Sequence, residues 1–565
     1  MSGPVKVDVL VVGSGAAGLS AAVTAAMHGA SVMVAEKASV LGGTSAWSGG
    51  WLWIPRNPLA RAEGIDEAAD APLTYLQHEM GGEAADIRLQ TFLRYGPEMV
   101  EFFHQRTAVQ FLSGSAMPDF HPSPGAANGG RSVTAQPYDG RLLGDWLHRL
   151  RPPLETISLG GMGIAGGADM AHFFNATRSP RSALYAARRL LRHGWQRLRA
   201  GRGQHLVNGN ALVARLLRSA LDAGVRFQLN APVVRLLQGP PGVSGAVLRS
   251  DSGGDSRRSW RRGAGLRRFP HDRQRLAQVV PHAAEGYGHF SAAPPDNQGE
   301  GIRLGESVGG QFDTSLRHPL AWAPVSRVTL ASGQQLMFPH LVERAKPGVI
   351  AVLPNGKRFV NEADSYHDFI AALLAATPAG DTPQAWLLAD RRTLRRYGLG
   401  HARPFPFTPT AWLRTGYLQR GNTLAELAKQ CAIDANALAE TVERFNHFAS
   451  TGEDVDFHRG ASAYNRAQGD HQVTLGPLRE GPFYAVRILP GSLGTFSGLQ
   501  TDEHARVLDE QQQPIPGLYA IGNDMSSVMR GYYPSGGITL GPAMTFGYLV
   551  GKGLTKKTNT NNNIT

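Results

Sequence analysis

The segment VDVLVVGSGAAGLSAAVTAAMHGASVMVAEK at residues 7–37 constrains the fold more than any other part of the chain. Residues 9–12 form a continuous apolar run, mostly β-branched, which predicts a buried parallel strand. Residues 19–28 predict a helix rich in small side chains, and residues 31–35 predict a second strand. This order of strand, glycine loop, helix and strand is the start of a doubly wound α/β domain.

Three glycines in this segment, Gly13, Gly15 and Gly18, have the spacing GxGxxG. The first permits a tight turn, the second lets the backbone approach a pyrophosphate, and the third allows close packing of helix and strand. Glu36 ends the second strand, where a carboxylate can bind ribose hydroxyls. The segment therefore predicts a dinucleotide site, because strand, loop, helix and acid all fall in order. The candidate residues are Gly13, Ser14, Gly15, Ala16, Ala17, Gly18, Glu36 and Lys37.

Composition excludes several other classes of protein. The 565 residues predict two or three domains. The single cysteine, Cys431, excludes a disulfide framework, a cysteine-ligated zinc site, an iron–sulfur cluster and a CxxCH haem attachment within this chain, and we expect no metal. The net charge of +12 favours acidic partners or membrane surfaces. No nucleic-acid motif is evident, so we expect no nucleic-acid partner.

The hydropathy pattern bears on location. The apolar run near the N-terminus is short and leads into the glycine loop, which indicates a strand rather than a signal peptide. There is no run of about eighteen apolar residues, so we expect no transmembrane helix. The default expectation is a cytoplasmic protein, with peripheral membrane association as the alternative.

Two further segments point to a flavin. Residues 37–50 read KASVLGGTSAWSGG, and the C-terminal region contains GLYAIGN at 517–523 and GGITLGPAMT at 536–545. Together these resemble the FAD-contacting segments of the succinate dehydrogenase and fumarate reductase flavoprotein superfamily. The resemblance implies FAD, which is expected to be bound non-covalently because residues 37–50 contain no histidine. It extends the candidate cofactor contacts to Gly42, Gly43, Thr44, Ser45, Gly49, Gly50, Val233, Val234, Gly522, Asn523, Gly536, Ile538, Thr539 and Leu540.

The resemblance also implies the domain organisation. We expect an α/β fold in which a Rossmann-like FAD-binding domain is built from N- and C-terminal segments, with an inserted α+β substrate (capping) domain. The expected divisions are residues 1–300 for the first FAD segment (with a basic helical insert at 141–205), 301–477 for the substrate domain, 478–553 for the second FAD segment, and 554–565 for a disordered tail.

Three local patterns are less usual. Residues 181–203 predict a helix with leucines on one face and arginines on the other. It is either a solvated helix packed on the domain or a helix at a membrane surface or ligand entrance. Residues 256–275 are rich in arginine, where resembling proteins carry an apolar strand; a solvated loop is the expectation, and divergence or a sequence error remain the two explanations. Residues 424–449 predict a pair of helices, with Asp434 as an N-cap.

The candidate chemistry rests on Tyr366. Fumarate reductases protonate their substrate with the arginine that ends the pattern RFxNExxxR, whereas here the segment reads RFVNEADSY. The tyrosine, together with YYPSGG at 532–537, resembles the 3-ketosteroid dehydrogenases. In their Δ1 branch a Tyr-x-x-x-Gly pair holds the ketone oxygen, and Tyr533 and Gly537 match it. The resemblance implies that this pair forms an oxyanion hole and that Tyr366 accepts the α-proton.

The implied function is an FAD-dependent desaturase of a hydrophobic cyclic ketone. The substrate would be a 3-oxosteroid or a simpler cyclohexanone-like ring, with hydride passing from the β-carbon to flavin N5 and an external quinone or dye-like acceptor taking the electrons. The Δ1 branch carries a further tyrosine in a PDYxP segment, where this chain has Phe120, so His121 is the candidate substitute. Ser535 matches the Tyr-x-Ser of the Δ4-(5α) branch, which leaves the position of the new double bond open.

Two alternative functions also fit parts of the sequence. A fumarate- or urocanate-type reductase of an unsaturated acid needs arginines that face the flavin, and Arg317, Arg358 and Arg530 are the candidates near motifs. A flavin-binding protein without catalytic activity is the third interpretation, favoured by Phe120 and by the arginine-rich stretch.

Overall fold

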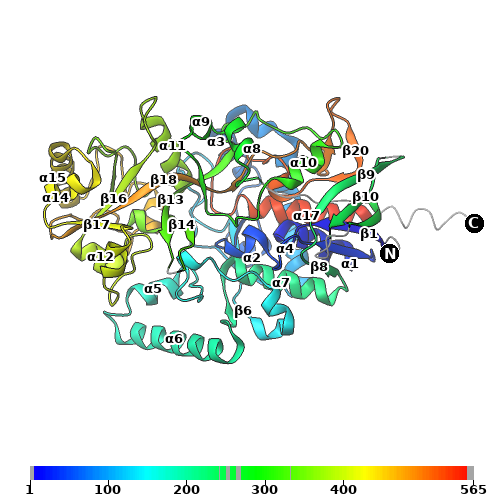
Figure 1. Ribbon diagram of the computed structural model, residues 1–565, viewed down its shortest axis with the longest axis horizontal. Coiled ribbons are helices and arrows are strands. Elements are labelled where there is room, and N and C mark those ends of the chain that lie inside the picture. Colours follow the sequence, from blue (N-terminus) through cyan, green and yellow to red (C-terminus); the bar gives the residue numbers. More distant parts are fainter. Residues whose placement is uncertain (1–4, 241, 250–254, 263–268, 331, 556–565) are drawn as a thin grey trace, which may run out of the picture.

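A computed structural model describes residues 5–240, 242–249, 255–262, 269–330 and 332–555 (Figure 1). Within these ranges, the GxGxxG segment belongs to a six-stranded sheet in which β1 pairs in parallel with both β2 and β11. The sheet order is β8 (Arg226–Gln228), β2 (Val32–Ala35), β1 (Val5–Val12), β11 (Asp255–Arg262), β10 (Gly242–Arg249) and β9 (Val233–Gly239). The strand, loop and helix order predicted from residues 7–37 is therefore present.

The two ends of the chain meet beside this sheet. Helix α1 (Ala16–Met27) packs along α17 (Leu540–Thr555), and both are at the right of Figure 1. The contact is close because Gly547 has no side chain; a Cβ atom there would lie 2.6 Å from the carbonyl oxygen of Ala17. Helix α7 (Asn208–Asp222) packs on α1 as well. The predicted α/β fold class is confirmed.

A second sheet occupies the opposite side of the molecule (Figure 1). Its main path is β14 (Gln335–Pro339), β13 (Leu320–Thr329), β18 (Phe483–Thr495), β16 (Ala385–Asp390) and β15 (Val349–Val352), with β12 (Phe290–Ser291) and β17 (Leu418–Gly421) also pairing with β18. Because β18 follows residue 477 and still belongs to this sheet, we propose that the chain returns to the FAD-binding region only after Thr495.

Helices cover the second sheet. They are α11 (Tyr366–Ala376), α12 (Arg391–Tyr397), α13 (Thr410–Arg414), α14 (Leu424–Cys431), α15 (Ala435–Thr451) and α16 (Ala463–Gln468). The predicted helix pair is present as α14 and α15. Its predicted cap is confirmed, because the side chain of Asp434 accepts a hydrogen bond from the backbone N–H of Ala437 at 2.9 Å.

The remaining helices and short strands lie outside the two large sheets. The helices are α2 (Pro58–Ala62), α3 (Ala71–Met80), α4 (Ile87–Arg106), α5 (Ala168–Phe174), α6 (Pro180–Ala200), α8 (Arg273–Val279), α9 (Pro281–Ala284) and α10 (Glu300–Glu306). The short strands are β3 (Trp51–Trp53), β4 (Phe111–Ser113), β5 (Ser132–Ala135), β6 (Tyr138–Asp139), β7 (His205–Leu206), β19 (Arg506–Leu508) and β20 (Pro514–Tyr519).

The arginine-rich stretch departs from the expected solvated loop. Residues 255–262 form β11, which lies between β1 and β10 in the first sheet, and residues 273–279 form α8. Residues 263–268 lie outside the described residues. Whether a segment forms a strand depends strongly on its surroundings. A place between two existing strands can therefore outweigh the charged side chains of this segment.

The basic insert contains a second departure. Helix α6 is formed where predicted, but its leucines do not pack on the domain. The helix rests instead on small and polar residues such as Ala186 and Gln196, and its leucine face is exposed.

Leu554 and Thr555 of the predicted tail are the last residues of α17, and residues 556–565 lie outside the described residues. Among the helices of the described ranges, none combines the length and the apolar character needed to cross a bilayer.

Candidate active site

The glycine loop has the geometry that its spacing predicts. Gly13 has a φ of 102°, in the region that favours glycine. A Cβ atom on Gly18 would lie 2.1 Å from the carbonyl oxygen of Gly13, so only glycine lets α1 pack this close to β1. Gly15 is the N-cap of α1, and among the described residues nothing accepts a hydrogen bond from its N–H. The loop thus presents a helix N-terminus and a free backbone donor to an anionic group.

Glu36 ties this loop to the next flavin segment. Its buried carboxylate accepts hydrogen bonds from the backbone N–H of Ser14, at 3.2 Å, and from the Ser14 hydroxyl, at 2.6 Å. The Ser14 hydroxyl oxygen in turn accepts from the N–H of Gly42 at 2.9 Å. Ser45 joins the same two segments, because its hydroxyl oxygen accepts from the N–H of Ala16 at 3.0 Å. Residues 13–18 and 42–45 therefore form one connected surface.

The outer parts of the predicted cofactor set reach the same region. Lys37 pairs with Glu300, and Thr44 accepts a hydrogen bond from the amide of Asn297 at 2.8 Å. Gly50 has a φ of 74° and lies against the start of α7. The chain that leads to Val233 and Val234 is fixed beside Glu36, whose carbonyl oxygen accepts from the N–H of Ala231 at 3.0 Å.

The C-terminal segment completes the cofactor region. Gly522, with a φ of 66°, packs against Ala17, and a Cβ atom on it would lie 3.0 Å from the Ala17 Cβ. The side-chain amide of Asn523 donates to the carbonyl oxygen of Thr495 at 2.6 Å, which links this segment to β18. Residues 536–540 then lead into α17. Four segments distant in the sequence are thus joined around backbone donors and glycines, an arrangement that fits FAD.

Tyr366 and Tyr533 meet at the boundary of the two sheets. The Tyr366 hydroxyl donates to the Tyr533 hydroxyl oxygen at 2.7 Å, and the rings stand edge to face with centroids 5.1 Å apart. Tyr366 is the first residue of α11, and Ser365 caps that helix by accepting from the N–H of Asp368 at 3.1 Å. The sequence therefore predicted two residues, 167 positions apart, that the fold brings into hydrogen-bond contact.

Gly537 lies four residues after Tyr533 in the loop that precedes α17. Its φ of 103° is unfavourable for any other residue, and a Cβ atom would lie 2.5 Å from the backbone nitrogen of Trp53. Its carbonyl oxygen accepts from the N–H of Trp53 at 3.1 Å. In the part of the chain that the structure describes, no group accepts a hydrogen bond from the Gly537 N–H. A backbone donor is thus left in the loop that carries Tyr533. Ser535, in the same loop, is buried.

Phe120 packs on both tyrosines. Its ring is stacked on Tyr533 with centroids 5.7 Å apart and an interplanar angle of 10°, and it meets Tyr366 edge to face at the same distance. The backbone N–H of Phe120 donates to the carbonyl oxygen of Pro534 at 3.0 Å. Phe120 therefore occupies the position at which a tyrosine would approach the pair, but it contributes packing and no hydroxyl.

His121, the candidate substitute for the missing tyrosine hydroxyl, lies between two carboxylates. One ring nitrogen contacts Glu79, and Nε2 contacts the Asp368 carboxylate at 2.8 Å. Burial alone would lower the pKa of His121, but the hydrogen bonds that its ring donates to Asp368 and Glu79 outweigh burial and raise the pKa to about 10. His121 is therefore a cation at neutral pH that joins the Phe120 loop to α11.

The protonation states of the pair follow from burial. Burial, together with the neighbouring Tyr533, raises the pKa of Tyr366 well above that of a free phenol. Burial also raises the pKa of Tyr533 to about 12. His367, which packs on Tyr533, is neutral because burial lowers its pKa to about 3. Both phenols are therefore protonated at neutral pH, and His367 supplies no positive charge to stabilise a phenolate.

The candidate arginines are mostly committed to ion pairs elsewhere. Arg358 contacts Glu362 at 2.7 Å and Asp454 at 2.8 Å in a buried cluster. Arg530 contacts Asp313 at 2.5 Å and also pairs with Glu83. Arg317 has no ion pair within the described ranges, and its guanidinium lies over the ring of Tyr532 at 5.3 Å.

Several residues that hold the site in place were not predicted from the sequence. Asp119 is buried and contacts Arg131 at 2.6 Å and the indole N–H of Trp53 at 2.8 Å, which fixes the Phe120 loop against β3 and β5. The hydroxyl of Tyr75 donates to the carbonyl oxygen of Pro534 at 2.6 Å and so holds the Tyr533 loop. The sequence gave one indication of them, the Pro-Asp pair before Phe120, because a carboxylate that is buried beside a proline turn needs a charged or hydrogen-bonding partner.

Comparisons with known proteins agree with this geometry. Residues 8–540 match the FAD binding domain family. The chain is 39% identical to 4-oxocyclohex-2-ene-1-carboxylate 5-dehydrogenase of Sinomonas cyclohexanicum, over 96% of this chain and 93% of that protein. It is 36% identical to a 3-oxosteroid 1-dehydrogenase of Mycolicibacterium smegmatis, over 96% of each.

A solved structure supports the same assignment. The crystal structure of 3-ketosteroid Δ1-dehydrogenase from Sterolibacterium denitrificans, in complex with 1,4-androstadiene-3,17-dione, superposes with a TM-score of 0.88 at 36% identity, covering 98% of this chain and 100% of that one. These enzymes are dehydrogenases of ring ketones. This chain belongs to the FAD binding domain family, in the 3-ketosteroid dehydrogenase-like branch of the succinate dehydrogenase and fumarate reductase flavoproteins, and it is an FAD-dependent oxidoreductase acting on CH–CH groups.

Proposed function

We propose that the chain desaturates a cyclic ketone at the bond next to its carbonyl group. The observation that carries the proposal is the contact of the Tyr366 and Tyr533 hydroxyls, in a site whose Tyr533 loop also holds the unpaired N–H of Gly537. When FAD is bound, it supplies the acceptor for the hydride that leaves the β-carbon. The side chains of this protein would handle the oxygen and the α-proton.

Tyr533 and Gly537 would hold the ketone oxygen. Because the pKa of Tyr533 is about 12, its hydroxyl keeps a proton that it can donate. While Tyr366 is protonated it donates to the Tyr533 oxygen, which leaves the Tyr533 proton free for another acceptor. Two donors aimed at one oxygen stabilise the negative charge that develops there as the α-proton leaves; loss of one such donor typically costs about 3–4 kcal/mol of transition-state stabilisation.

Tyr366 would first release its hydroxyl proton to solvent and would then accept the α-proton as a phenolate. A phenol with an ordinary pKa of about 10 needs roughly 4 kcal/mol of selective stabilisation to ionise near pH 7. The N-terminus of α11, where Tyr366 lies, supplies about 0.3–2 kcal/mol of this. Burial acts in the opposite direction. Tyr366 is therefore a base that works best in alkaline solution.

The substrate would be a six-membered ring ketone. The named relatives act on 3-oxosteroids and on oxocyclohexane or oxocyclohexene carboxylates, and a ring ketone with an oxidisable neighbouring bond is what they share. We propose a 3-oxosteroid or a simpler cyclohexanone as the substrate. An external acceptor, quinone-like or dye-like, would then reoxidise the enzyme, because only one dinucleotide motif is evident in the sequence.

The reductase alternative is less well supported. It requires cationic side chains that bind the carboxylates of an unsaturated acid near the tyrosine pair. Arg358 and Arg530 are neutralised by buried or half-buried acids, so neither is free for a substrate anion. Tyr366 also stands in the place of the proton-donating arginine.

The test is anaerobic mixing of the FAD-loaded protein with three ketones. These are a 3-oxosteroid, a 5α-reduced 3-oxosteroid and 4-oxocyclohexanecarboxylate, with flavin absorbance followed and products identified by mass spectrometry. Loss of the oxidised flavin absorbance with a product lighter by two hydrogens is the expected result, and the ketone that reacts fastest identifies the substrate class.

Two results would contradict the proposal. The first is retention of the oxidised flavin spectrum with all three ketones, combined with reoxidation of chemically reduced enzyme by fumarate or urocanate. The second is equal rates in the wild type and in Tyr533→Phe.

A further inference from the structure

Helix α6 carries an apolar surface that the rest of the molecule leaves uncovered. Four large side chains recur at spacings of seven, four and three residues, which places them on one face of the helix. They are Leu184 (73% exposed), Leu191 (75%), Trp195 (56%) and Leu198 (85%). We refer to these four residues as the apolar stripe. Single exposed leucines are common on soluble proteins, but a contiguous apolar face of this kind usually marks an interaction site, so the stripe calls for a partner.

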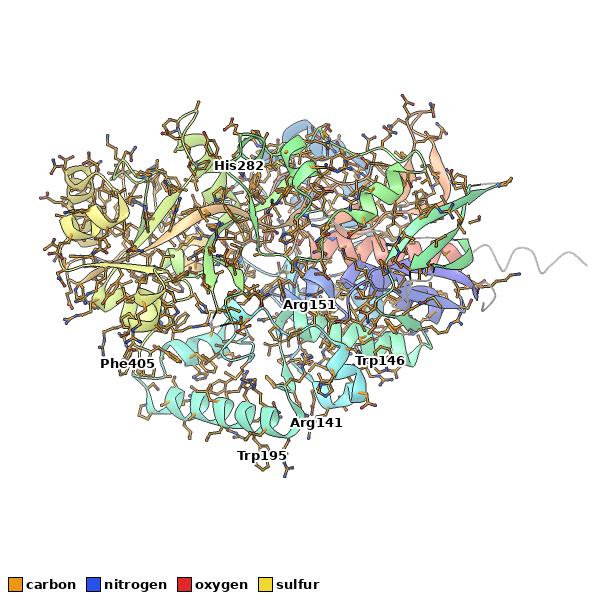
Figure 2. All side chains as sticks on the ribbon, in the orientation of Figure 1. Arg141, Trp146, Arg151, Trp195, His282 and Phe405 are labelled. Atoms are coloured by element: carbon orange, nitrogen blue, oxygen red, sulfur yellow. The ribbon has the colours of Figure 1, made fainter. Side chains whose placement is uncertain are left out.

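The opposite face of α6 holds the helix to the protein. Arg189 contacts Asp169 at 2.9 Å, and the side-chain oxygen of Gln196 accepts from the backbone N–H of Gln204 at 2.9 Å. Ser179 caps the N-terminus, and Gly201 ends the helix in the left-handed conformation. The helix is thus fixed in place with the apolar stripe turned outward. Figure 2 shows Trp195 below α6, directed away from the body of the molecule.

A row of arginines runs along one edge of the stripe. At 100° per residue, Arg181, Arg188, Arg192 and Arg199 fall next to the leucines, and all four are exposed. None of them forms an ion pair within the described ranges. The sequence contains no acidic residue between Asp169 and Asp222, so no nearby carboxylate offsets this charge from within the segment.

We propose that α6 docks on the surface of an anionic lipid bilayer. The leucines and Trp195 would enter the boundary between headgroups and acyl chains, and the arginines would contact lipid phosphates, which is the pattern of a helix that lies in a membrane interface. A second copy of this chain fits less well, because it would bring one row of unpaired arginines against another. The helix lies on the membrane and does not cross it, in keeping with the absence of a spanning helix among the described residues.

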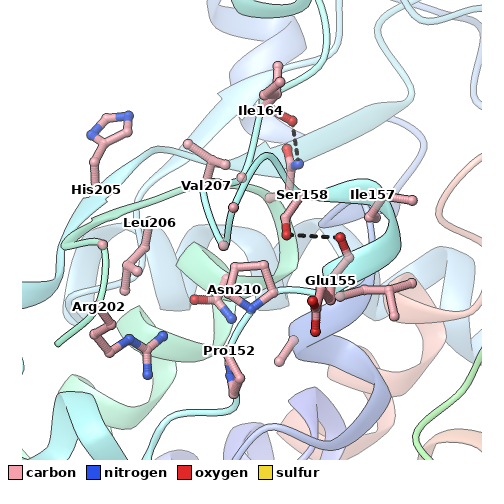
Figure 3. Close-up of a pocket in the computed structure, with 18 of the residues that line it drawn as sticks. Pro152, Glu155, Ile157, Ser158, Ile164, Arg202, His205, Leu206, Val207 and Asn210 are labelled. Carbon is pink, nitrogen blue, oxygen red and sulfur yellow. Dashed lines mark hydrogen bonds between the residues drawn. The ribbon is translucent and has the colours of Figure 1, made fainter. Parts of the chain in front are cut away.

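A cavity beneath α6 gives this docking a consequence. The cavity has a volume of about 390 Å³ and is lined by His193 and Arg197 of α6 at one end and by Trp47 and Ser48, next to the flavin-contacting loop, at the other. Figure 3 shows its wall, with Ile157, Ile164, Leu206 and Val207 among the lining side chains. A docked α6 would place this cavity between the lipid surface and the flavin loop, on the side from which an apolar ketone or a lipid-dissolved acceptor would come.

The test is sedimentation of the FAD-loaded protein with vesicles. One set contains phosphatidylcholine alone and another contains added phosphatidylglycerol. We expect binding to the anionic vesicles that weakens as salt is added. Leu191→Gln with Leu198→Gln should weaken binding about tenfold or more, and Arg181→Gln with Arg192→Gln should weaken it about fivefold per arginine. Val455→Gln is the matched control, since Val455 is also exposed but lies outside α6; it should bind as the wild type does.

A second measurement locates the contact. Brominated lipids should quench the fluorescence of the wild type more than that of Trp195→Phe. All of these variants change exposed side chains, so the bound-flavin spectrum and the activity with a water-soluble ketone should stay unchanged.

Three results would overturn the proposal: equal binding of the leucine variant and the wild type to anionic vesicles, no difference in quenching between the wild type and Trp195→Phe, or a wild-type dimer in lipid-free solution that the leucine changes convert to a monomer. The last would identify a second copy as the partner.

Discussion

At the scale of single residues, the proposed reaction depends most on Tyr366. Replacing it with Phe keeps the ring that packs on Phe120 and removes only the hydroxyl. Because general-base catalysis contributes about 10²–10⁴-fold, we expect the rate of flavin reduction by ketone to fall by that factor in Tyr366→Phe. Stopped-flow absorbance measures this rate. Tyr464→Phe is the control, since Tyr464 also packs on Phe120 but forms no hydrogen bond through its hydroxyl within the described residues. Equal losses in both variants would argue against a specific role for Tyr366.

The raised pKa of Tyr366 has its own signature. The residue is protonated at neutral pH, and the form that accepts a proton is the phenolate. The rate of flavin reduction should therefore rise as the pH rises from 7 towards 10. Rapid-mixing measurements at saturating ketone over this range test the expectation, and Tyr366→Phe should give a flat profile. A wild-type rate that falls over the same range would point to a different base.

The predicted and unpredicted residues of the site differ in a physical way. Tyr366, Tyr533 and Gly537 could be found because each lies in a local segment whose spacing resembles a known pattern. The Asp119–Arg131 pair and the contact of His121 with Asp368 could not, because ionic contacts depend on which loops the fold brings together. A one-dimensional pattern records neither the partner nor the burial that fixes its charge.

At the scale of elements, the contact of α1 with α17 holds the two ends of the chain together. A methyl group at Gly547 would lie 2.6 Å from the carbonyl oxygen of Ala17, so Gly547→Ala must push the helices apart. We expect a loss of about 1–3 kcal/mol of unfolding free energy and weaker binding of FAD. Gly553→Ala on the same helix is the control, because nothing lies within 4 Å of its Cβ position. It should be neutral or stabilising by up to about 1 kcal/mol. Denaturant unfolding and FAD titration measure both; equal behaviour of the two variants would contradict the packing argument.

His121 joins two elements, the Phe120 loop and α11, through its contact with Asp368. Its pKa is raised from 6.5 to about 10 in the folded protein, so its ionised form contributes stability that is fully present below pH 6.5 and is lost as the pH rises through 10. His121→Gln should therefore lower the melting temperature more at pH 6 than near pH 10. Exposed His504→Gln is the control and should show no such difference. Thermal unfolding of the FAD-loaded proteins gives the comparison. A difference in melting temperature between His121→Gln and wild type that stays constant across this pH range would show that the charge of His121 does not hold the two elements together.

Two elements show the limits of amphipathic patterns. The leucine spacing of α6 predicted a helix correctly, but periodicity reports only that a face is apolar and not whether protein covers it. In α6 the apolar stripe is exposed and the polar side faces the protein. The segment of β11 shows the opposite limit. Its arginines predicted a solvated loop, whereas its backbone forms a strand that pairs with β1 and β10.

At the scale of the whole molecule, the cofactor region is assembled from residues near both ends of the chain. The loop at Gly13, the loop at Gly42, the start of β9 and the loop at Gly522 are joined by a few hydrogen bonds, such as that of Ser14 with Glu36, while the tyrosine pair connects them to the second sheet. A ligand that contacts all four segments at once binds the folded chain and not the unfolded one. Its binding free energy is therefore added to the stability of the entire fold.

Removal of FAD should accordingly destabilise the whole chain. At a free FAD concentration 100 times its dissociation constant, the added stability is about 2.7 kcal/mol. We expect the FAD-free protein to melt at a lower temperature, and we expect its melting temperature to rise with each increment of added FAD. Limited proteolysis should cleave it near both termini at once, because α1 and α17 depend on each other. Calorimetry with and without FAD measures the first effect, and mass spectrometry of the fragments measures the second. An unchanged melting temperature, or cleavage confined to one end, would mean that the two terminal segments hold together without the cofactor.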